Sequence, residues 1–219
     1  MRGTVMKTIV SSSLDAACNL ELEKRLLEEG KGESFVLFWQ SHNTIVLGRH
    51  QRAESEINME EAQAAGTSIV RRITGGGAVY QDLGNLNFSI ITDSDGTDSY
   101  RKFLNPVVRC LMDIGVPVTF NDRNDLLIEG RKFSGSAQLV RNGRVLHHGT
   151  LLIHSDLEWM DRLLVPHPEK LARNQVVSVR ARVVNLWDYL PGDLRGVEPV
   201  RNRLLEYLKK VPYLLSNSK

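Results

Sequence analysis

The residues that could do chemistry concentrate in one stretch, Arg71 to Asn85, which reads RRITGGGAVYQDLGN. Two arginines, Arg71 and Arg72, precede three consecutive glycines, Gly75, Gly76 and Gly77. Glycine allows positive φ and close approach of another group, and successive backbone N–H groups in such a turn can converge on an anion. Arginine donates to phosphate or carboxylate in a planar fork. The stretch therefore predicts a cradle for a phosphate or an activated carboxylate. The alternative is a tight hairpin in which the glycines only permit the turn.

A second polar stretch, Asn121 to Gln138, carries a lysine and a neighbouring amide and carboxylate. Lys132 stands between a turn and a Ser-Gly-Ser run, where it could counter a carboxylate and a phosphate together without acting as a nucleophile. It could equally be a solvated lysine that blunts a sheet edge. Asn124 and Asp125 could hold Mg²⁺ beside phosphates, or they could be turn residues that bond their own backbone.

Several common sites are disfavoured by the same stretches. No Gly-Lys-Ser/Thr follows the glycines, and no G-x-G-x-x-G opens a helix, so neither a Walker loop nor a dinucleotide fingerprint is present. His147 and His148 are adjacent on an expected strand and point to opposite faces, so one is expected at a site and the other in a structural role. No His-Glu-x-x-His occurs, which disfavours a metallohydrolase.

Composition bounds the class of protein. The 219 residues are 42% hydrophobic and 25% charged, with a net charge of +2, as in an ordinary globular chain. No dense Lys/Arg block suggests nucleic acid, and no apolar run is long enough to span a membrane. The two cysteines, Cys18 and Cys110, lack metal-type spacing, which favours a reducing environment and predicts a cytoplasmic protein.

The periodicity predicts a single α/β (α+β) domain over residues 1–219, with a mixed, mainly antiparallel sheet flanked by helices. A first helix is expected at Leu14–Gly30, with Asp15 as its candidate N-cap and an apolar face of Leu20, Leu22, Leu26 and Leu27. After a polar loop, Thr92–Ser99, a helix is expected to run through Leu111 and Met112 to Gly115, with Pro106 in its first turn or at its start. Further helices are expected at Met59–Ala65, Leu157–Leu164 and Val200–Lys210. Strands are expected at Phe35–Trp39, Thr44–Leu47, Ser68–Ile73, Asn87–Ile91, Asp125–Ile128, Lys132–Ser136, Gln138–Arg141, Val145–His148 and Leu151–Ile153. Hairpin turns are expected at Gln40–Asn43, Glu129–Arg131 and Asn142-Gly143.

Three separated segments resemble one family. RRITGGGAVYQDLGNLNFS, RNDLLIEGRKFSGSAQ followed by HHGTLL, and SVRARVVNLWDYLPG are similar to the catalytic domain of lipoate–protein ligase A. NLELEKRLLEE and FVLFWQSHNTIVLGR fit the N-terminal pattern of that family, so the resemblance runs from about Ser11 to Leu208. It implies the biotin/lipoate ligase fold, which is related to class II aminoacyl-tRNA synthetases.

The resemblance also implies roles for individual residues. Lys132 is the catalytic lysine, contacting the lipoyl carboxyl group and the phosphate. Those implied to hold ATP and lipoyl-AMP are Arg72, Gly75, Gly76, Gly77, Ala78, Val79, Tyr80, Asn85 and Lys132. Those implied for the lipoyl pocket are Trp39, Arg72, Gly76, His148 and Gly149. Asn124 and Asp125 match the pair near the phosphate and Mg²⁺, and Pro166 to Val183 looks like the adenylate-covering loop.

The implied activity uses ATP, Mg²⁺ and lipoate to make lipoyl-AMP, and then transfers the lipoyl group to a lysine of an acceptor. Expected acceptors are lipoyl domains of 2-oxoacid dehydrogenases, the glycine-cleavage H protein or similar. Gln81 departs from the family pattern, where many members have His. The chain stops soon after Tyr213, so the C-terminal accessory domain is expected to be absent and a separate polypeptide could supply it. Alternatives are an ATP-independent lipoyl or octanoyl transferase, a transfer-only subunit and a non-catalytic lipoyl-binding subunit.

Overall fold

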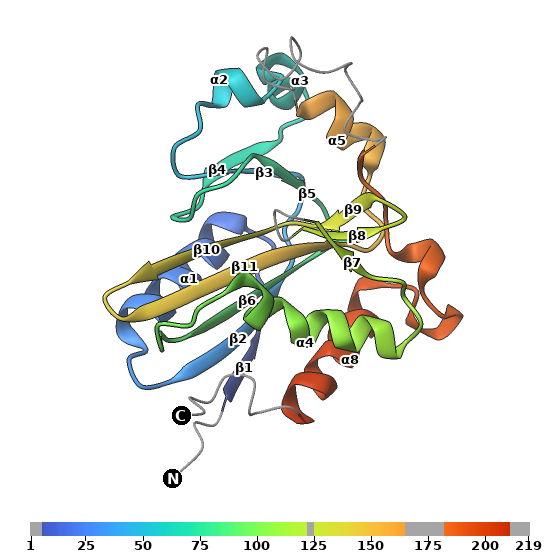
Figure 1. The fold of residues 1–219 in the computed structure, drawn as a ribbon. Helices are drawn as coiled ribbons and strands as arrows, with labels where there is room; N and C mark the ends of the chain where they lie inside the picture. The colour runs from blue at the N-terminus through green and yellow to red at the C-terminus, as the bar shows by residue number, and fades with distance from the viewer. Residues whose placement is uncertain (1–5, 122–124, 165–181, 211–219) are drawn as a thin grey trace.

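A five-stranded sheet runs through the middle of the molecule in the computed structural model, which describes residues 6–121, 125–164 and 182–210 (Figure 1). Its strand order is β1-β2-β6-β11-β10, with β1 and β2 parallel and every other neighbouring pair antiparallel. The strands are β1 (Met6–Val10), β2 (Ser34–Trp39), β6 (Asn85–Asp93), β10 (Ser136–Arg141) and β11 (Arg144–Leu152). The prediction of a mixed, mainly antiparallel sheet is confirmed.

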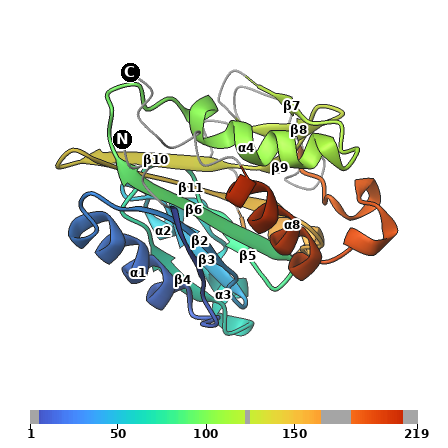
Figure 2. The ribbon, with the colours of Figure 1, turned by 90° about the horizontal axis from the view of Figure 1, so that it is seen from below.

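Helices cover both faces of this sheet. Figure 2 shows α1 (Ala16–Glu29) on one side, and α4 (Tyr100–Asp113) and α8 (Val197–Lys210) on the other. Because successive side chains of a strand point to opposite faces, the central strands are buried on both sides and read as nearly continuous apolar runs. The face under α4 and α8 holds the largest apolar cluster, which includes Phe38, Phe88 and Phe103.

A second, three-stranded sheet has the order β4-β3-β5 and lies above the five-stranded sheet in the view of Figure 1. Its strands are β3 (Thr44–Leu47), β4 (Ser68–Arg71) and β5 (Val79–Gln81), and the helices packed against it are α2 (Ala53–Glu56), α3 (Met59–Ala64) and α5 (Leu157–Leu163). β3 pairs with β4 in parallel and with β5 in the antiparallel sense. Between this sheet and these helices lies a second apolar cluster, which includes Ile45, Tyr80 and Leu163.

The hairpin predicted at Gln40–Asn43 is wrong. Both edges of β2 are occupied, one by β1 and the other by β6, so β3 has no edge of β2 to pair with and enters the second sheet instead. The glycine stretch is not a hairpin either. Its flanking strands, β4 and β5, lie on opposite sides of β3, so the stretch crosses the end of β3.

The two remaining hairpin predictions are confirmed. In the third sheet, β7 (Thr119–Phe120), β8 (Leu126–Ile128) and β9 (Arg131–Ser134) pair antiparallel, and Glu129 and Gly130 make the β8–β9 turn at φ 52° and 77°. Asn142 and Gly143 join β10 to β11 at φ 51° and 73°. Positive φ at two successive turn residues matches the right-handed twist of the flanking strands.

The predicted helices are confirmed in type, with one correction. Asp15 caps α1 by accepting from Ala17 N–H, as expected. Pro106 lies in the middle of α4, not in its first turn, because Ser99 caps the helix and the turn from Tyr100 buries Phe103. The short elements β1, β5, β7, α2 and the 3₁₀ turns Trp187–Tyr189 and Gly192–Leu194 were not predicted. Within the described ranges, no helix has both the length and the apolar character needed to cross a bilayer.

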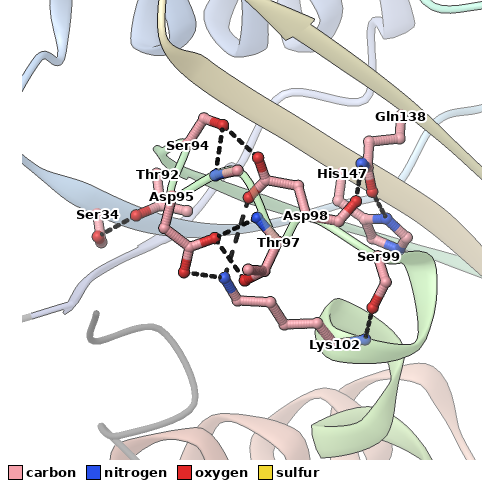
Figure 3. Close-up of polar contacts among 11 residues, drawn as sticks. Ser34, Thr92, Ser94, Asp95, Thr97, Asp98, Ser99, Lys102, Gln138 and His147 are labelled. Atoms are coloured by element: carbon pink, nitrogen blue, oxygen red, sulfur yellow. Dashed lines mark hydrogen bonds and ion pairs between the residues drawn. The ribbon is translucent and has the colours of Figure 1, made fainter. Parts of the chain in front are cut away.

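The loop before α4 is held by its own polar side chains (Figure 3). Asp95 accepts from the backbone N–H of Thr97 and forms an ion pair with Lys102. Gln138 on β10 donates its amide to Asp98 O at 2.8 Å, and its Oε1 lies 3.0 Å from Nδ1 of His147. The loop and the start of α4 are therefore tied to the edge of the five-stranded sheet.

Candidate active site

A pocket lies between the five-stranded sheet, α1 and the second sheet. Its wall combines an apolar side, a set of polar side chains and exposed glycine backbone. The apolar residues are Leu20, Trp39, Val46, Ala78, Val79, Phe88 and Ala137; the polar ones include Glu23, Arg72, Gln81, Asn87, Lys132 and His148; the glycines are Gly76, Gly77, Gly135 and Gly149. Two cations against one carboxylate make the wall suited to a ligand that has both an aliphatic and an anionic part.

The glycine stretch reaches the pocket through Gly76 and Gly77. Gly76 has φ 93°, and a Cβ at this position would lie 2.8 Å from Nη2 of Arg72. The stretch also packs against the end of β3, because a Cβ at Gly48 would lie only 2.0 Å from Gly76 O. Both glycines are therefore required by close approach of backbone and guanidinium, and Gly76 by its conformation as well.

The Arg72 side chain holds the glycine stretch in place through hydrogen bonds. Its side chain is buried and donates to the carbonyl oxygens of Val46, Gly75 and Gly77 at 2.7–3.1 Å, and to Thr74 Oγ1 at 3.1 Å. Burial lowers the pKa of the guanidinium to about 10, which still leaves it charged at neutral pH. Among the described residues, no carboxylate lies within ion-pair distance of it. Arg71, the other arginine, donates to Gly48 O and Gln51 O and does not line the pocket.

Lys132 enters the pocket from β9. Its Nζ lies 2.8 Å from Oδ1 of Asp125, whose other oxygen accepts from Asn121 Nδ2 at 2.9 Å. A Cβ at Gly135 would lie 2.8 Å from the same Nζ, so the lysine packs directly on that glycine. The lysine backbone is fixed too, since Val184 N–H donates to Lys132 O at 2.9 Å. Asn124 and most of the predicted adenylate-covering loop lie outside the described residues.

The structure brings most of the predicted site residues together. Trp39, Arg72, Gly76, Gly77, Ala78, Val79, Lys132, His148 and Gly149 all line the pocket. Asp125 does not line it but pairs with Lys132, which does. Three others also lie outside the wall: Gly75 is exposed, Tyr80 is buried in the core of the second sheet, and Asn85 is buried beside Asn87. Burial raises the pKa of the Tyr80 hydroxyl, so it stays protonated. These three support pocket residues next to them on the chain or in the same network.

The two histidines face opposite ways, as predicted. His148 lines the pocket, with Nδ1 2.8 Å from Oε2 of Glu23 and Nε2 2.8 Å from Oγ1 of Thr74. His147 is fully buried on the other face, where its ring stacks on Phe103 at 5.3 Å between centroids. Burial lowers the pKa of His147 to about 3. Among the described residues, no cluster of three metal-ligating side chains occurs.

Glu23 is the main pocket residue that the sequence prediction missed. The predicted apolar face of the first helix was Leu20, Leu22, Leu26 and Leu27, whereas the fully buried residues are Ala16, Asn19, Glu23 and Leu27. The burial of Glu23 in one row with Ala16, Asn19 and Leu27 is a feature of the structure, and a glutamate in an amphipathic helix does not stand out in the sequence. Gln81, noted only as a departure, also lines the pocket, where it forms a reciprocal amide pair with Asn87.

Neither cysteine lies in the pocket wall. Cys18 is exposed on α1, and its hydrogen bond to Asp15 raises the pKa of the thiol. Cys110 is buried on α4, and burial raises its pKa to about 11. Both thiols are therefore poor nucleophiles at neutral pH.

Comparison with known proteins identifies the family. Residues 15–209 match the family model described as the lipoyl protein ligase A/B catalytic domain, and the chain belongs to this family. It is 36% identical over 197 residues to the lipoate-protein ligase LplJ of Bacillus subtilis (strain 168), which covers 89% of this chain and 59% of that protein.

Solved structures agree with this assignment. An archaeal lipoylation system from Thermoplasma acidophilum, a bi-partite lipoate protein ligase with its E2 lipoyl domain, matches with a TM-score of 0.83 and 27% identity, over 96% of this chain and 84% of that chain. A lipoate-protein ligase A bound with ATP matches with a TM-score of 0.82 and 25% identity, over 97% and 86%. The chain spans 53% to 59% of the length of three curated relatives it matches.

Proposed function

We propose that this chain catalyses ATP-dependent ligation of lipoate to protein. Lipoate and ATP form lipoyl-AMP and pyrophosphate, and a lysine amine of an acceptor protein then attacks the mixed anhydride to form an amide and release AMP. The observation that carries the proposal is the pocket itself, in which an apolar side meets two cations and the glycine stretch. Family membership and the ATP-bound relative support it.

The chain's residues would contribute positioning and electrostatics. The apolar side, with Trp39, Val46 and Val79, suits the aliphatic chain of lipoate. Arg72, Lys132 and the backbone N–H groups of the glycine stretch suit the carboxylate and phosphate, where charge develops as the adenylate forms and breaks down. The acyl group of an adenylate is already activated, so holding it in line with the incoming amine accounts for much of the acceleration.

The residues present fit Mg²⁺ only as a partial site. Mg²⁺ is usually held by one or two carboxylates together with substrate phosphates. Asp125 supplies one carboxylate near the pocket, and it is paired with Lys132 at 2.8 Å. Asp125, with Asn124, would therefore hold the ion in company with the phosphates of ATP, and the ion would supply positive charge to those phosphates.

The positions and pKa values of the two cysteines disfavour the alternative of an ATP-independent lipoyl or octanoyl transferase. A transferase without ATP that works through a thioester needs a reactive thiol at the acyl group. Cys18 and Cys110 lie outside the pocket wall, and both have raised pKa values. Retention of Arg72, Lys132 and the glycine stretch also argues against a non-catalytic lipoyl-binding subunit.

Partners follow from the same proposal. We propose lipoyl domains of 2-oxoacid dehydrogenases, or the glycine-cleavage H protein, as acceptors; the Thermoplasma ligase was solved with its E2 lipoyl domain. That ligase is bi-partite, which supports a separate accessory polypeptide as a partner of this chain. The cytoplasmic location stays a prediction from cysteine usage.

The test is direct. The purified chain is incubated with ATP, Mg²⁺ and lipoate, and mass spectrometry follows lipoyl-AMP while pyrophosphate release is measured. Accumulation of lipoyl-AMP supports the ligase. If no lipoyl-AMP forms, yet the chain transfers the lipoyl group from synthetic lipoyl-AMP to a lipoyl domain, the transfer-only function replaces it. If neither step occurs and a thioester is trapped, the cysteine transferase replaces it.

A further inference from the structure

A line of polar side chains connects the buried face of α1 to the glycine stretch. Glu23 on α1 bonds His148 on β11 at 2.8 Å, and the other ring nitrogen of His148 bonds Thr74 Oγ1 at 2.8 Å. Thr74 Oγ1 accepts in turn from Nε of Arg72 at 3.1 Å. As whole residues, Glu23, Thr74 and Arg72 are at most 7% exposed, and His148 is 8% exposed. The line therefore runs from the buried Glu23 carboxylate to the buried Arg72 guanidinium through the His148 ring and the Thr74 hydroxyl.

Counting protons gives this line a direction. Trp39 Nε1–H and Ser89 O–H both donate to Oε1 of Glu23, and a carboxylate only accepts. The remaining oxygen, Oε2, must then receive a proton from Nδ1 of His148. Arginine also only donates, so Thr74 Oγ1 accepts from Arg72 and its single hydroxyl proton points to Nε2 of His148. If Nε2 carried a proton instead, the Thr74 hydroxyl proton would have no acceptor among the bonds of the described residues.

The two ends of the line carry opposite charges. Arg72 has no carboxylate in contact among the described residues, and its hydrogen bonds otherwise go to backbone carbonyls. Within the same ranges, Glu23 contacts no arginine or lysine, and His148 is the one titratable side chain that bonds its carboxylate. Each buried charge is costly alone, and the polarised line between them offsets part of that cost.

We infer that Glu23 is a positioning residue for Arg72, acting through His148 and Thr74 to fix the guanidinium and hence the carbonyls of the glycine stretch. The inference deepens the proposed function, because Arg72 and that stretch are the groups proposed to hold the adenylate. Glu23 need not touch the reacting atoms for this role. It sets the direction of the two hydrogen bonds made by the His148 ring, and so decides whether the Thr74 hydroxyl proton has an acceptor.

The variant Glu23→Gln gives a specific prediction. Trp39 can only donate, so the oxygen of Gln must face Trp39 and Ser89, and its NH₂ group must face His148. Nδ1 of His148 then has to accept, and the ring must move its proton to Nε2. The hydrogen bonds on both sides of His148 then reverse, whereas Arg72 still donates to Thr74 Oγ1, and the Thr74 hydroxyl proton loses its acceptor. The shape of the side chain at position 23 is preserved.

Nitrogen NMR of the substrate-free protein reads this out. His148 is assigned by the loss of its signals in His148→Gln. We expect the Nδ1–H tautomer in the unmodified protein and the Nε2–H tautomer in Glu23→Gln. A wild-type ring protonated on Nε2, or a tautomer unchanged by Glu23→Gln, overturns the inference. Because no substrate is present, this result is independent of whether the chain makes lipoyl-AMP.

Binding of lipoyl-AMP tests the link to Arg72. Calorimetry is expected to show that Thr74→Val weakens binding by about tenfold, while Thr74→Ser, which keeps the hydroxyl, stays within about threefold. Glu23 and Thr74 do not bond each other, yet the double variant should lose at least about fivefold less than the product of the single losses. Fully multiplicative losses overturn the inference, and this holds even if the tautomer is as expected.

A matched control uses a buried hydroxyl of the five-stranded sheet. Ser34 Oγ lies 2.7 Å from Thr92 Oγ1, away from the pocket wall (Figure 3). Ser34→Ala combined with Thr74→Val is expected to give multiplicative losses. If Glu23→Gln does not fold, the wild-type tautomer and the Thr74 pair still decide: a wild-type Nε2–H ring, or Thr74→Ser as weak as Thr74→Val, overturns the inference.

Discussion

The two faces of the five-stranded sheet put neighbouring histidines to opposite uses. His147 stacks on Phe103 and meets Tyr100 edge-on at 5.3 Å, in a core where burial lowers its pKa to about 3. His148, one residue later, bonds Glu23 and Thr74 and lines the pocket. The face under α4 and α8 thus supplies stability, and the α1 face supplies the polar groups proposed to do chemistry.

Two buried arginines repeat the contrast. Arg144 forms an ion pair with Asp93 at 2.7 Å and donates to carbonyls at the end of α1, including Leu26 O and Leu27 O. Its charge is matched locally and caps a helix. Arg72 is matched to no carboxylate in contact within the described ranges. A buried cation without a direct partner is a better indication of an anionic ligand than a buried cation with one.

The largest expected effect is at Lys132. Lys132→Ala should reduce lipoyl-AMP formation by about a thousandfold, because it removes a cation proposed to stabilise developing charge. The melting temperature should change little, since this side chain is 40% exposed and its pair with Asp125 lies near the surface. Pyrophosphate release and thermal unfolding are measured together, with Lys102→Ala as the control away from the pocket. An unchanged rate of pyrophosphate release would contradict the assigned role.

The second largest effect is expected for Gly76→Val, which tests whether the glycine stretch binds lipoyl-AMP or has only a structural role. Valine is disfavoured at φ 93° and would meet Nη2 of Arg72, so lipoyl-AMP affinity should fall by about a hundredfold. Gly143→Val is the matched control, because Gly143 also has positive φ, at 73°, but lies in the β10–β11 turn with no atom within 4 Å of an added Cβ. Each substitution should cost about 1–3 kcal/mol of unfolding free energy. If both variants bind lipoyl-AMP normally, the glycine stretch is scaffold.

The free energy of unfolding should fall in acid because of His147, on the sheet face under α4 and α8. Because the folded-state pKa of His147 is lowered to about 3, the unfolded chain binds a proton first as pH falls below its ordinary value near 6.5. The contribution is fully present above that value and is lost as pH falls toward 3. Between pH 6.5 and pH 5, His147→Met should lose about 2 kcal/mol less unfolding free energy than the unmodified protein. Urea unfolding at several pH values measures this; parallel pH curves for the two proteins would exclude His147 as the cause.

The smallest expected effect is at the cysteines. Cys18→Ser combined with Cys110→Ala should leave lipoyl transfer to a lipoyl domain within about twofold, since neither thiol lines the pocket. Alanine is chosen at position 110 because a buried serine would bring an unsatisfied hydroxyl into the core. A folded but inactive double variant would favour the thioester reaction.

Local signals in the sequence predicted local structure well. The Asn142-Gly143 turn, the Asp15 cap and the alternation of His147 and His148 each depend on one or two residues and their backbone preferences. Pairing between distant strands could not be predicted this way. The predicted β2–β3 hairpin is wrong because β1 and β6, which are distant from the Gln40–Asn43 turn in the sequence, occupy both edges of β2.

The residues of the candidate site that belong to a sequence motif were predicted, and the one that lies on an amphipathic helix was missed. The glycine stretch and Lys132 stand out as residue types in sequence and do line the pocket. Glu23 does not stand out, because a glutamate in an amphipathic helix is expected to face solvent. Only the fold shows that Trp39, Ser89 and His148 converge on its carboxylate.

Binding of lipoyl-AMP to the purified chain tests the central claim most directly, because it does not depend on an accessory polypeptide or on a particular acceptor. Calorimetry should give a dissociation constant of about 1 μM or tighter, weakened at least about a hundredfold by Lys132→Ala and unchanged by Lys102→Ala. Absence of binding, or binding that Lys132→Ala leaves intact, would contradict the assignment of this pocket to the adenylate.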